Sequence, residues 1–220
     1  MKLKGVIFDM DGTLVDNLAY HFLAFDEYAK REGFTLLEPV SLKINGMHSN
    51  DIFPLLLGDE VVAKYGLDRL NREKEEVYRD MYRSKITPIA GLMELLQAAK
   101  KAGVKCAIGS SGCRENVEMI VEGLGIADLI DASISGSDVT HGKPHPEIFI
   151  KAYEALGLKA EECVVVEDAV NGIVAGVSAG CKCIAITTTA SAETLSEAGA
   201  SICFADYSTV TIEQMNELLR

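Results

Sequence analysis

The chain has 220 residues, of which 48% are hydrophobic and 25% charged, so it is long enough for one sizeable core and a small second domain. Its 33 acidic and 21 basic side chains give a formal charge of −12, and no basic cluster stands out, which argues against nucleic-acid binding. No uninterrupted apolar stretch approaches the ~18 residues of a membrane span, and the six cysteines lack the paired spacing of metal ligands, so we expect a cytoplasmic protein with reduced thiols and no membrane partner.

The first predicted element is a short strand, Gly5–Phe8, whose apolar run indicates burial on both faces. Residues 17–85 then carry helical patterns, the longest over 61–82, and no strand is predicted among them. A connection of this length is too long for a loop, so we expect a separate all-helical cap domain, residues 17–85, over the mouth of the sheet. The core domain would comprise residues 1–16 and 86–220.

After residue 90, predicted strands and helices alternate along the chain. Short runs rich in Val and Ile predict five more strands buried on both faces, at 104–109, 132–135, 163–166, 183–187 and 202–204. One helical pattern ends at Gly103, and another begins around Pro146 and ends around Gly157. The alternation predicts an α/β fold, a doubly wound, Rossmann-like parallel sheet with helices on both faces and with its chemistry at the carboxyl ends of the strands.

The first strand runs directly into Asp9, Met10, Asp11, Gly12 and Thr13. Because side chains alternate along an extended backbone, the two carboxylates point the same way. Buried carboxylates need a partner, and a cation is the simplest one. A calcium loop is excluded, because its fifth and sixth positions hold Thr13 and Leu14 instead of an acidic or amide residue and glycine. The structural alternative is an Asp-Gly turn without chemistry.

Polar side chains also lie at the ends of two later strands. The strand at 104–109 is followed by Ser110, Ser111 and Gly112, and the strand at 163–166 by Glu167 and Asp168. Between them, Lys143 stands near the start of a predicted helix and is available as a fixed cation. Each feature has a structural alternative: Ser110 as a helix cap, Lys143 as a solvated loop charge, and the acid pair as capping residues.

Taken together, these groups suit phosphoryl transfer. A divalent metal and Lys143 can neutralise the repulsion between a carboxylate nucleophile and a phosphate dianion. Asp9 would attack phosphorus and form an aspartyl-phosphate. Asp11 would protonate the leaving oxygen and then deprotonate the incoming water or alcohol.

The remaining groups would bind the substrate phosphate and the metal. Ser110 and the nearby backbone N–H groups of Ser111 and Gly112 would hold the phosphoryl oxygens. Asp168, supported by Glu167, would complete the oxygen shell of Mg²⁺. Asp9 and the backbone carbonyl of Asp11 would face the same ion.

In order along the chain, segments 9–14, 110, 142–144 and 167–168 resemble the four motifs of the haloacid dehalogenase superfamily. The resemblance implies Mg²⁺-dependent phosphate chemistry at Asp9. The helical insertion directly after the first motif resembles the cap of the β-phosphoglucomutase and sugar-phosphate phosphatase subgroup. True dehalogenases lack the second aspartate of the first motif, so Asp11 implies phosphate chemistry instead of dehalogenation.

The roles of residues in the expected cap domain follow only from the family resemblance. His21 matches a mutase histidine that assists sugar-hydroxyl chemistry, although related phosphatases also carry it and a lone histidine can be structural. Lys74 matches a substrate-contacting mutase lysine, or it belongs to a charged helical face. Segment 45–51 stands where mutases have a loop with an arginine for a second phosphate, and it contains none. This favours a singly phosphorylated substrate, unless Lys74 or Arg72 supplies the cation.

The leading hypothesis is a Mg²⁺-dependent phosphatase that hydrolyses a small phosphorylated metabolite, such as a sugar or polyol phosphate. A β-phosphoglucomutase is the first alternative. The second is a phosphoacceptor signalling module, but such modules place the nucleophile on a later strand than their first acid pair. The sequence leaves the substrate and the oligomeric state open, a monomer included.

Overall fold

The computed structural model describes residues 2–40 and 49–220. The chain divides into two compact units. The core unit comprises Met1–Asp16 and Ile86–Arg220, and the helical unit comprises Asn17–Lys85.

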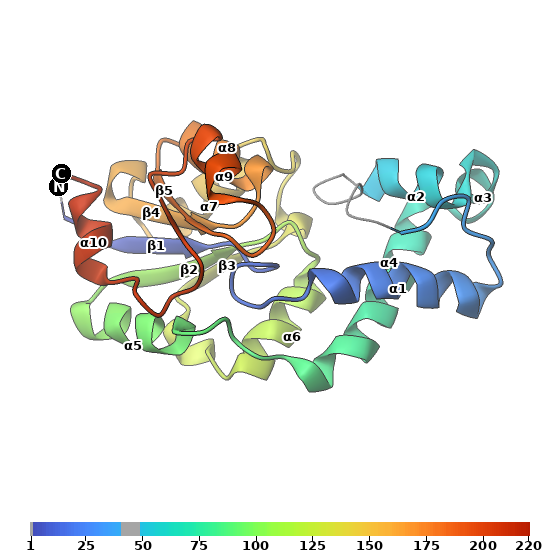
Figure 1. Cartoon of the computed structure of the whole chain (residues 1–220), viewed down its shortest axis with the longest axis horizontal. Helices are drawn as coiled ribbons and strands as arrows, with labels where there is room; N and C mark the ends of the chain where they lie inside the picture. The colour runs from blue at the N-terminus through green and yellow to red at the C-terminus, as the bar shows by residue number, and fades with distance from the viewer. Residues whose placement is uncertain (1, 41–48) are drawn as a thin grey trace. The chain divides into compact units, whose positions relative to one another are not determined.

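A six-stranded parallel sheet, in the order β3-β2-β1-β4-β5-β6, forms the centre of the core unit (Figure 1). Its strands are β1 (Gly5–Phe8), β2 (Lys105–Gly109), β3 (Ala132–Ile134), β4 (Cys163–Glu167), β5 (Lys182–Ile186) and β6 (Ile202–Phe204). In β1, Phe8 lies opposite Ile108 of β2 on one side and Val166 of β4 on the other. The predicted doubly wound α/β fold is therefore confirmed.

The edge strands differ from the prediction of burial on both faces. All residues of β3 and β6 are only partly buried, whereas β1 and β4 are buried throughout. An edge strand has a neighbour on one side only and is covered less completely. Five strand boundaries also differ by one residue from those expected.

Helices cover both faces of the sheet. They are α5 (Leu92–Ala102), α6 (Arg114–Leu124), α7 (Glu147–Ala155), α8 (Val170–Ser178), α9 (Ala192–Glu197) and α10 (Ile212–Glu217). On one face, Phe149 of α7, Ile173 of α8 and Leu195 of α9 join a buried cluster with side chains of the central strands. Helices α5 and α6 lie on the opposite face (Figure 1).

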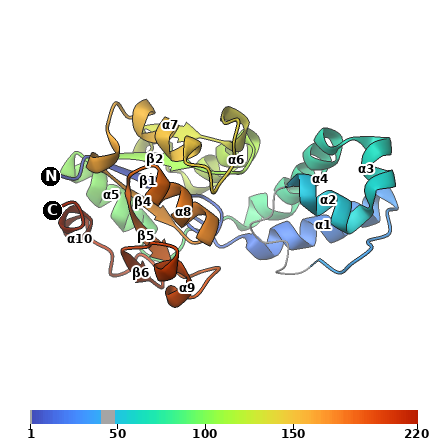
Figure 2. The same ribbon diagram turned by 90° about the horizontal axis from the view of Figure 1, so that it is seen from above.

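The two ends of the core unit lie side by side in both views (Figures 1 and 2). The backbone N–H of Leu3 donates to Oδ1 of Asn216, near the end of α10, at 2.9 Å. The same views place α7 and α8 over the strands that surround β1. The carboxyl end of β1 is therefore held inside a layered α/β core.

The helical unit contains α1 (Leu18–Glu32), α2 (Ser49–Leu57), α3 (Asp59–Tyr65) and α4 (Leu67–Tyr82). The pattern over 61–82 is divided between α3 and α4 because Gly66, with φ of 80°, ends one helix and precedes the next. The buried residues of α4 recur at helical spacing and include Leu70, Lys74 and Tyr78. A lysine thus occupies an otherwise apolar buried stripe.

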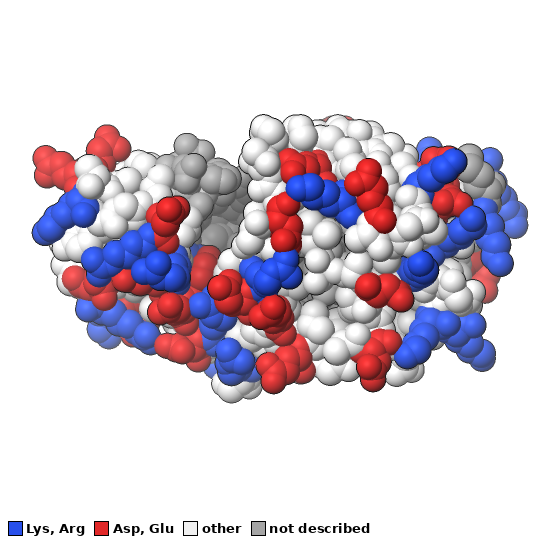
Figure 3. Space-filling view, turned by 180° about the vertical axis from the view of Figure 1, so that it is seen from behind, with Lys and Arg blue, Asp and Glu red and all other residues white. Residues whose placement is uncertain are grey.

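Charged side chains of both signs are interspersed over the face of the molecule in Figure 3. Neither sign forms a continuous field on this face. Among the described residues, no helix is both long and apolar enough to cross a membrane.

Candidate active site

Asp9 follows β1 directly, between the exits of β2 and β4. The chain order reverses at this point of the sheet, where ligands of open α/β sheets gather. The Asp9 backbone N–H donates to the Val166 carbonyl at 2.9 Å, which fixes the residue to the sheet, and its side chain is only 9% exposed. Gly12 has φ of 82°, and a Cβ there would collide with the Asp168 carboxylate. The turn after Asp9 therefore requires glycine.

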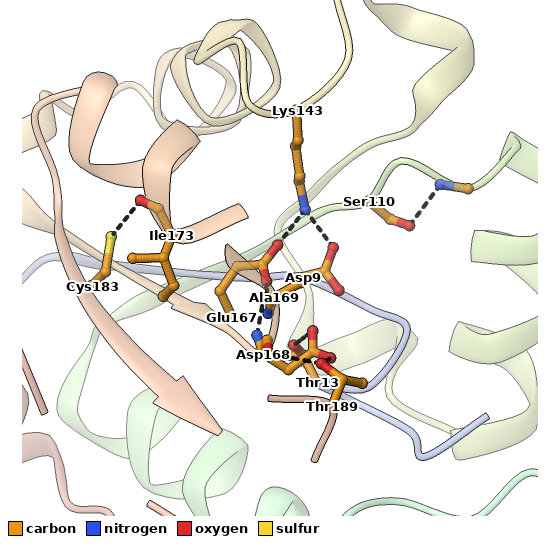
Figure 4. Close-up of polar contacts among 11 residues, drawn as sticks. Asp9, Thr13, Ser110, Lys143, Glu167, Asp168, Ala169, Ile173, Cys183 and Thr189 are labelled. Atoms are coloured by element: carbon orange, nitrogen blue, oxygen red, sulfur yellow. Dashed lines mark hydrogen bonds and ion pairs between the residues drawn. The ribbon is translucent and has the colours of Figure 1, made fainter. Parts of the chain in front are cut away.

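Lys143 reaches this carboxylate from the segment that leads into α7 (Figure 4). Its Nζ lies 2.5 Å from Oδ1 of Asp9 and 2.8 Å from Oε1 of Glu167, and it stands over the Phe149 ring at 4.7 Å. Burial by itself would lower the pKa of Lys143, but the charges of Asp9 and Glu167 outweigh it and raise the pKa. Lys143 is therefore a charged, buried cation.

Glu167, the last residue of β4, fixes Lys143 and the following turn. Its Oε1 accepts from Lys143, while Oε2 accepts the backbone N–H groups of Asp168 at 2.7 Å and Ala169 at 2.8 Å. A Cβ at Gly172 would collide with this carboxylate. The absence of a side chain at Gly172 of α8 therefore leaves room for the Glu167 carboxylate.

Asp168 is oriented by hydroxyl groups. Thr13 donates to its Oδ1 at 3.1 Å and Thr189 to its Oδ2 at 2.5 Å (Figure 4). Burial raises the pKa of Asp168, as do the charges of Glu167 and Asp9, while the two hydroxyls oppose the shift. Burial likewise raises the pKa of Asp9, with Lys143 opposing it.

The carboxylates of Asp9, Glu167 and Asp168 offer oxygen atoms within 4.8 Å of one another, and all three residues are buried. Lys143 contacts two of them, so a single lysine faces three carboxyl groups. Burial opposes the ionisation of such a cluster unless a further cation is bound, and clustered carboxylate oxygens fit a hard divalent cation such as Mg²⁺. The Asp11 carboxylate lies outside this cluster, although its charge acts on Asp9.

Ser110 lies at the exit of β2, next to β1. Its backbone N–H donates to the Ile134 carbonyl at 3.0 Å, and its buried Oγ accepts the N–H of Gly112 at 3.0 Å. A Cβ at Gly112 would lie 3.6 Å from Oδ2 of Asp11. The Ser110 turn therefore lies beside the first motif, with the Ser111 side chain exposed.

The cap candidates lie close together within the helical unit. His21 stacks on Tyr78 with ring centroids 3.9 Å apart, and its Nδ1 is 4.0 Å from Oε2 of Glu75. Lys74 is 4% exposed, pairs with Glu75, and lies 4.6 Å above the Phe25 ring. The burial of Lys74 contradicts the alternative in which this residue belongs to an exposed charged face of the helix, and the expected substrate contact stays a prediction.

Residues 45–48 of the segment without arginine lie outside the described residues. The expectation about a second-phosphate loop therefore stays a prediction from the sequence.

Three side chains that sequence reasoning left unassigned support the site. Thr189 binds Asp168, Thr188 donates to the Gly12 carbonyl at 2.5 Å, and the Tyr207 hydroxyl donates to the Thr13 carbonyl at 2.9 Å. Both threonines follow β5 at the carboxyl edge of the sheet, the same signal that pointed to Ser110. Tyr207 carries no local signal.

Comparisons with known proteins agree with this geometry. Residues 6–186 match the family model described as haloacid dehalogenase-like hydrolase. Hexitol phosphatase A of Escherichia coli is 29% identical over 221 residues, covering 100% of this chain and 99% of that protein. Beta-phosphoglucomutase of Bacillus subtilis is 32% identical over 188 residues, covering 81% and 80%.

A solved structure is similar over almost its whole length. The crystal structure of a HAD hydrolase, family IA, variant 3, from Entamoeba histolytica superposes with a TM-score of 0.86 at 29% identity, covering 99% of both chains. The family match spans strand β1 to strand β5 and includes the residues that meet around Asp9, apart from Thr188, Thr189 and Tyr207. The chain therefore belongs to the haloacid dehalogenase-like hydrolase family.

Proposed function

We propose that the chain is a Mg²⁺-dependent phosphatase that hydrolyses a sugar or polyol phosphate through an aspartyl-phosphate on Asp9. The observation that carries the proposal is the buried ion pair of Asp9 with Lys143 beside two further carboxylates. A lysine in this position can neutralise a phosphate dianion while a carboxylate attacks it. The full-length similarity to a hexitol phosphatase supports the substrate class.

Each residue has a role in this reaction. Asp9 attacks phosphorus, and Lys143 holds the Asp9 carboxylate in place by its contact to Oδ1. Asp11 gives a proton to the leaving oxygen and takes one from the attacking water. Ser110 and the backbone N–H groups after it bind the phosphoryl oxygens.

Asp9, Asp168 and the Asp11 main-chain carbonyl would hold the Mg²⁺ ion, which supplies charge stabilisation to the transferred phosphoryl group. Both Glu167 oxygens already accept hydrogen bonds, so Glu167 would act by fixing Lys143 and the turn at Asp168. Thr189 and Thr13 would keep the Asp168 carboxylate in its orientation.

β-Phosphoglucomutase is the second candidate, favoured by the similarity to the Bacillus subtilis enzyme. The pairing of Lys74 with Glu75 beside His21 within the helical unit offers a cation and a proton-handling group for a sugar. The first candidate is preferred because sequence segment 45–51 contains no arginine for a second phosphate.

A screen of sugar and hexitol phosphates for phosphate release, with Mg²⁺ and again with a chelator, tests the proposal. We expect many turnovers per chain with Mg²⁺ and none with the chelator, which would also exclude a signalling module. Turnover that survives the chelator would contradict the metal-dependent mechanism.

Asp9→Asn tests the nucleophile. Turnover should fall more than ~100-fold, because an amide cannot form the phosphoenzyme and is a poorer metal ligand. Asp128→Asn, an exposed change in the same unit, serves as the matched control and should keep full activity. A folded Asp9→Asn protein with more than about a hundredth of the wild-type rate would overturn the assignment.

A further inference from the structure

Three potential metal ligands lie together at the start of α7, outside the cluster around Asp9. They are His141, His145 and Glu147, and each offers a ligand atom within 4.8 Å of the other two. Both histidines are exposed, and the ring centroids are 4.7 Å apart. The proposed phosphatase reaction uses none of these side chains.

Glu147 is held in a fixed orientation. Its Oε1 accepts from the Thr140 backbone N–H at 3.0 Å and lies 2.8 Å from Nζ of Lys151, and its Oε2 accepts from the His141 backbone N–H at 3.0 Å. The Lys151 contact, followed by the Thr140 N–H, lowers the pKa of Glu147 to about 2. The carboxylate is therefore ionised at neutral pH and keeps one oxygen turned toward the histidines.

The spacing of the ligand atoms suits a small tetrahedral ion. Nδ1 of His141 and Oε2 of Glu147 are 3.3 Å apart. Two ligands at ~2.0 Å from a tetrahedral Zn²⁺ are separated by about 3.3 Å, so this pair already spans one edge of such a site. Nδ1 of His145 faces the Glu147 backbone N–H at 3.3 Å, a long contact that a metal could replace.

We propose that His141, His145 and Glu147 form a second cation site, which takes Zn²⁺ or a similar imidazole-binding ion with solvent in the open position. Two imidazoles select Zn²⁺, Ni²⁺ or Cu²⁺ over Mg²⁺, whereas the oxygen ligands around Asp9 favour Mg²⁺. The two sites would therefore hold different metals. The alternative is that Glu147 only fastens the loop before α7 through its hydrogen bonds.

Direct zinc binding distinguishes the two readings. The untagged protein, in excess Mg²⁺, is titrated with Zn²⁺ in competition with a chromogenic chelator. We expect one zinc equivalent for the wild type, and at least ~10-fold weaker binding for both His141→Ala and His145→Ala, because each loses a ligand. Glu154→Gln, an exposed change on the same helix, is the matched control and should bind as the wild type does.

Thermal denaturation of each variant checks that the fold is retained, which is expected because both histidines are exposed. The proposal is overturned if the wild type takes up no zinc in excess Mg²⁺, or if either histidine variant binds zinc as tightly as the wild type. A copper complex of the wild type provides a second readout, since its electron paramagnetic resonance spectrum should show nitrogen coupling that His145→Ala reduces.

Discussion

Glu167 carries more contacts than its place beside Asp168 in the sequence suggests. One carboxylate oxygen binds Lys143 and the other binds two backbone N–H groups of the turn. The space for it is made by Gly172, where a Cβ would collide with the carboxylate. Glu167, to which we assign no step of the proposed reaction, thus fixes the position of Lys143.

Gly172→Ala tests this positioning. The added methyl should displace Glu167, leave Lys143 and two backbone groups without their partner, and destabilise the core unit by ~2 kcal/mol. Turnover should fall at least ~10-fold in the variant that remains folded. Ser178→Ala, an exposed change on the same helix, should alter neither quantity. Normal turnover and stability in Gly172→Ala would mean that Glu167 can move without consequence.

Asp168→Ala tests the metal assignment at the same scale. Loss of one carboxylate should raise the Mg²⁺ concentration for half-maximal activity by ~100-fold or more, because the ion is held by charge and geometry. Thr189→Val, which removes only a hydroxyl that orients Asp168, should raise it less, by ~10-fold. Magnesium titrations of both variants give the comparison. An unchanged requirement in Asp168→Ala would exclude it as a ligand.

The acidic and basic site residues could be predicted because each lies at a strand exit or in a recognisable segment. Asp9 and Asp168 are far apart in sequence, yet each lies at the carboxyl end of a strand, and the parallel sheet brings these ends to one edge. Lys143 reaches them from the segment before α7. Thr189 was not predicted although it follows a strand exit, because the pattern does not show that its hydroxyl turns toward Asp168. Tyr207 was not predicted because no local pattern marks it.

At the scale of the element, the buried face of α4 contains one charged residue, Lys74, among apolar side chains. Burying an ammonium among Leu70, Tyr78 and other apolar side chains opposes stability unless a partner compensates, and Glu75 is that partner. A methionine of similar length would fill the same space without the charge. We therefore infer that Lys74 serves binding rather than packing.

Lys74→Met separates the two explanations. The folded protein should be as stable as the wild type or more stable, by about 1 kcal/mol, because a buried ion pair often contributes less than apolar packing. Turnover with the preferred substrate should nevertheless fall ~10-fold or more. Lys64→Met, on exposed α3, is the control and should leave turnover unchanged. Reduced stability with normal kcat and KM would assign Lys74 a structural role.

Element prediction succeeded where a long helical periodicity or a compact apolar run marked the element, and failed for short helices that have neither. The helix α5 and the strands β1 and β6 occupy their expected positions. Helices α9 and α10 have six residues each, too few for an apolar stripe to stand out from the flanking loops. The partial exposure of β3 and β6 depends on their places at the edges, which only the strand order determines.

For the whole molecule, the strand order places Asp9 at the end of β1, where the two halves of the sheet meet. The sequence predicts parallel strands, because helices alternate with them, but not which strands pair. Pairing joins residues that are far apart, such as Gly5 with Cys163, and depends on the packing of both sheet faces. The candidate site is therefore formed by residues at the carboxyl ends of β1, β2 and β4.

The two candidate reactions differ in what attacks the aspartyl-phosphate once the first leaving group has departed. In a phosphatase it is water. In a mutase it is a hydroxyl of a sugar that already carries a phosphate, which requires exclusion of water and a cation for the second phosphate. Since segment 45–51 contains no arginine, we expect water to prevail.

With a hexose monophosphate and Mg²⁺, free phosphate should therefore appear continuously, and a bisphosphorylated primer should not accelerate conversion of β-glucose 1-phosphate to glucose 6-phosphate.

His21→Ala should slow the prevailing reaction by ~10- to 10,000-fold, the range for a lost proton-handling group. An unchanged rate would mean that His21 has only a structural role, stacked on Tyr78. If isomerisation outruns phosphate release, and Lys74→Ala abolishes isomerisation while sparing hydrolysis, the chain is a mutase and the buried lysine of α4 supplies the missing cation.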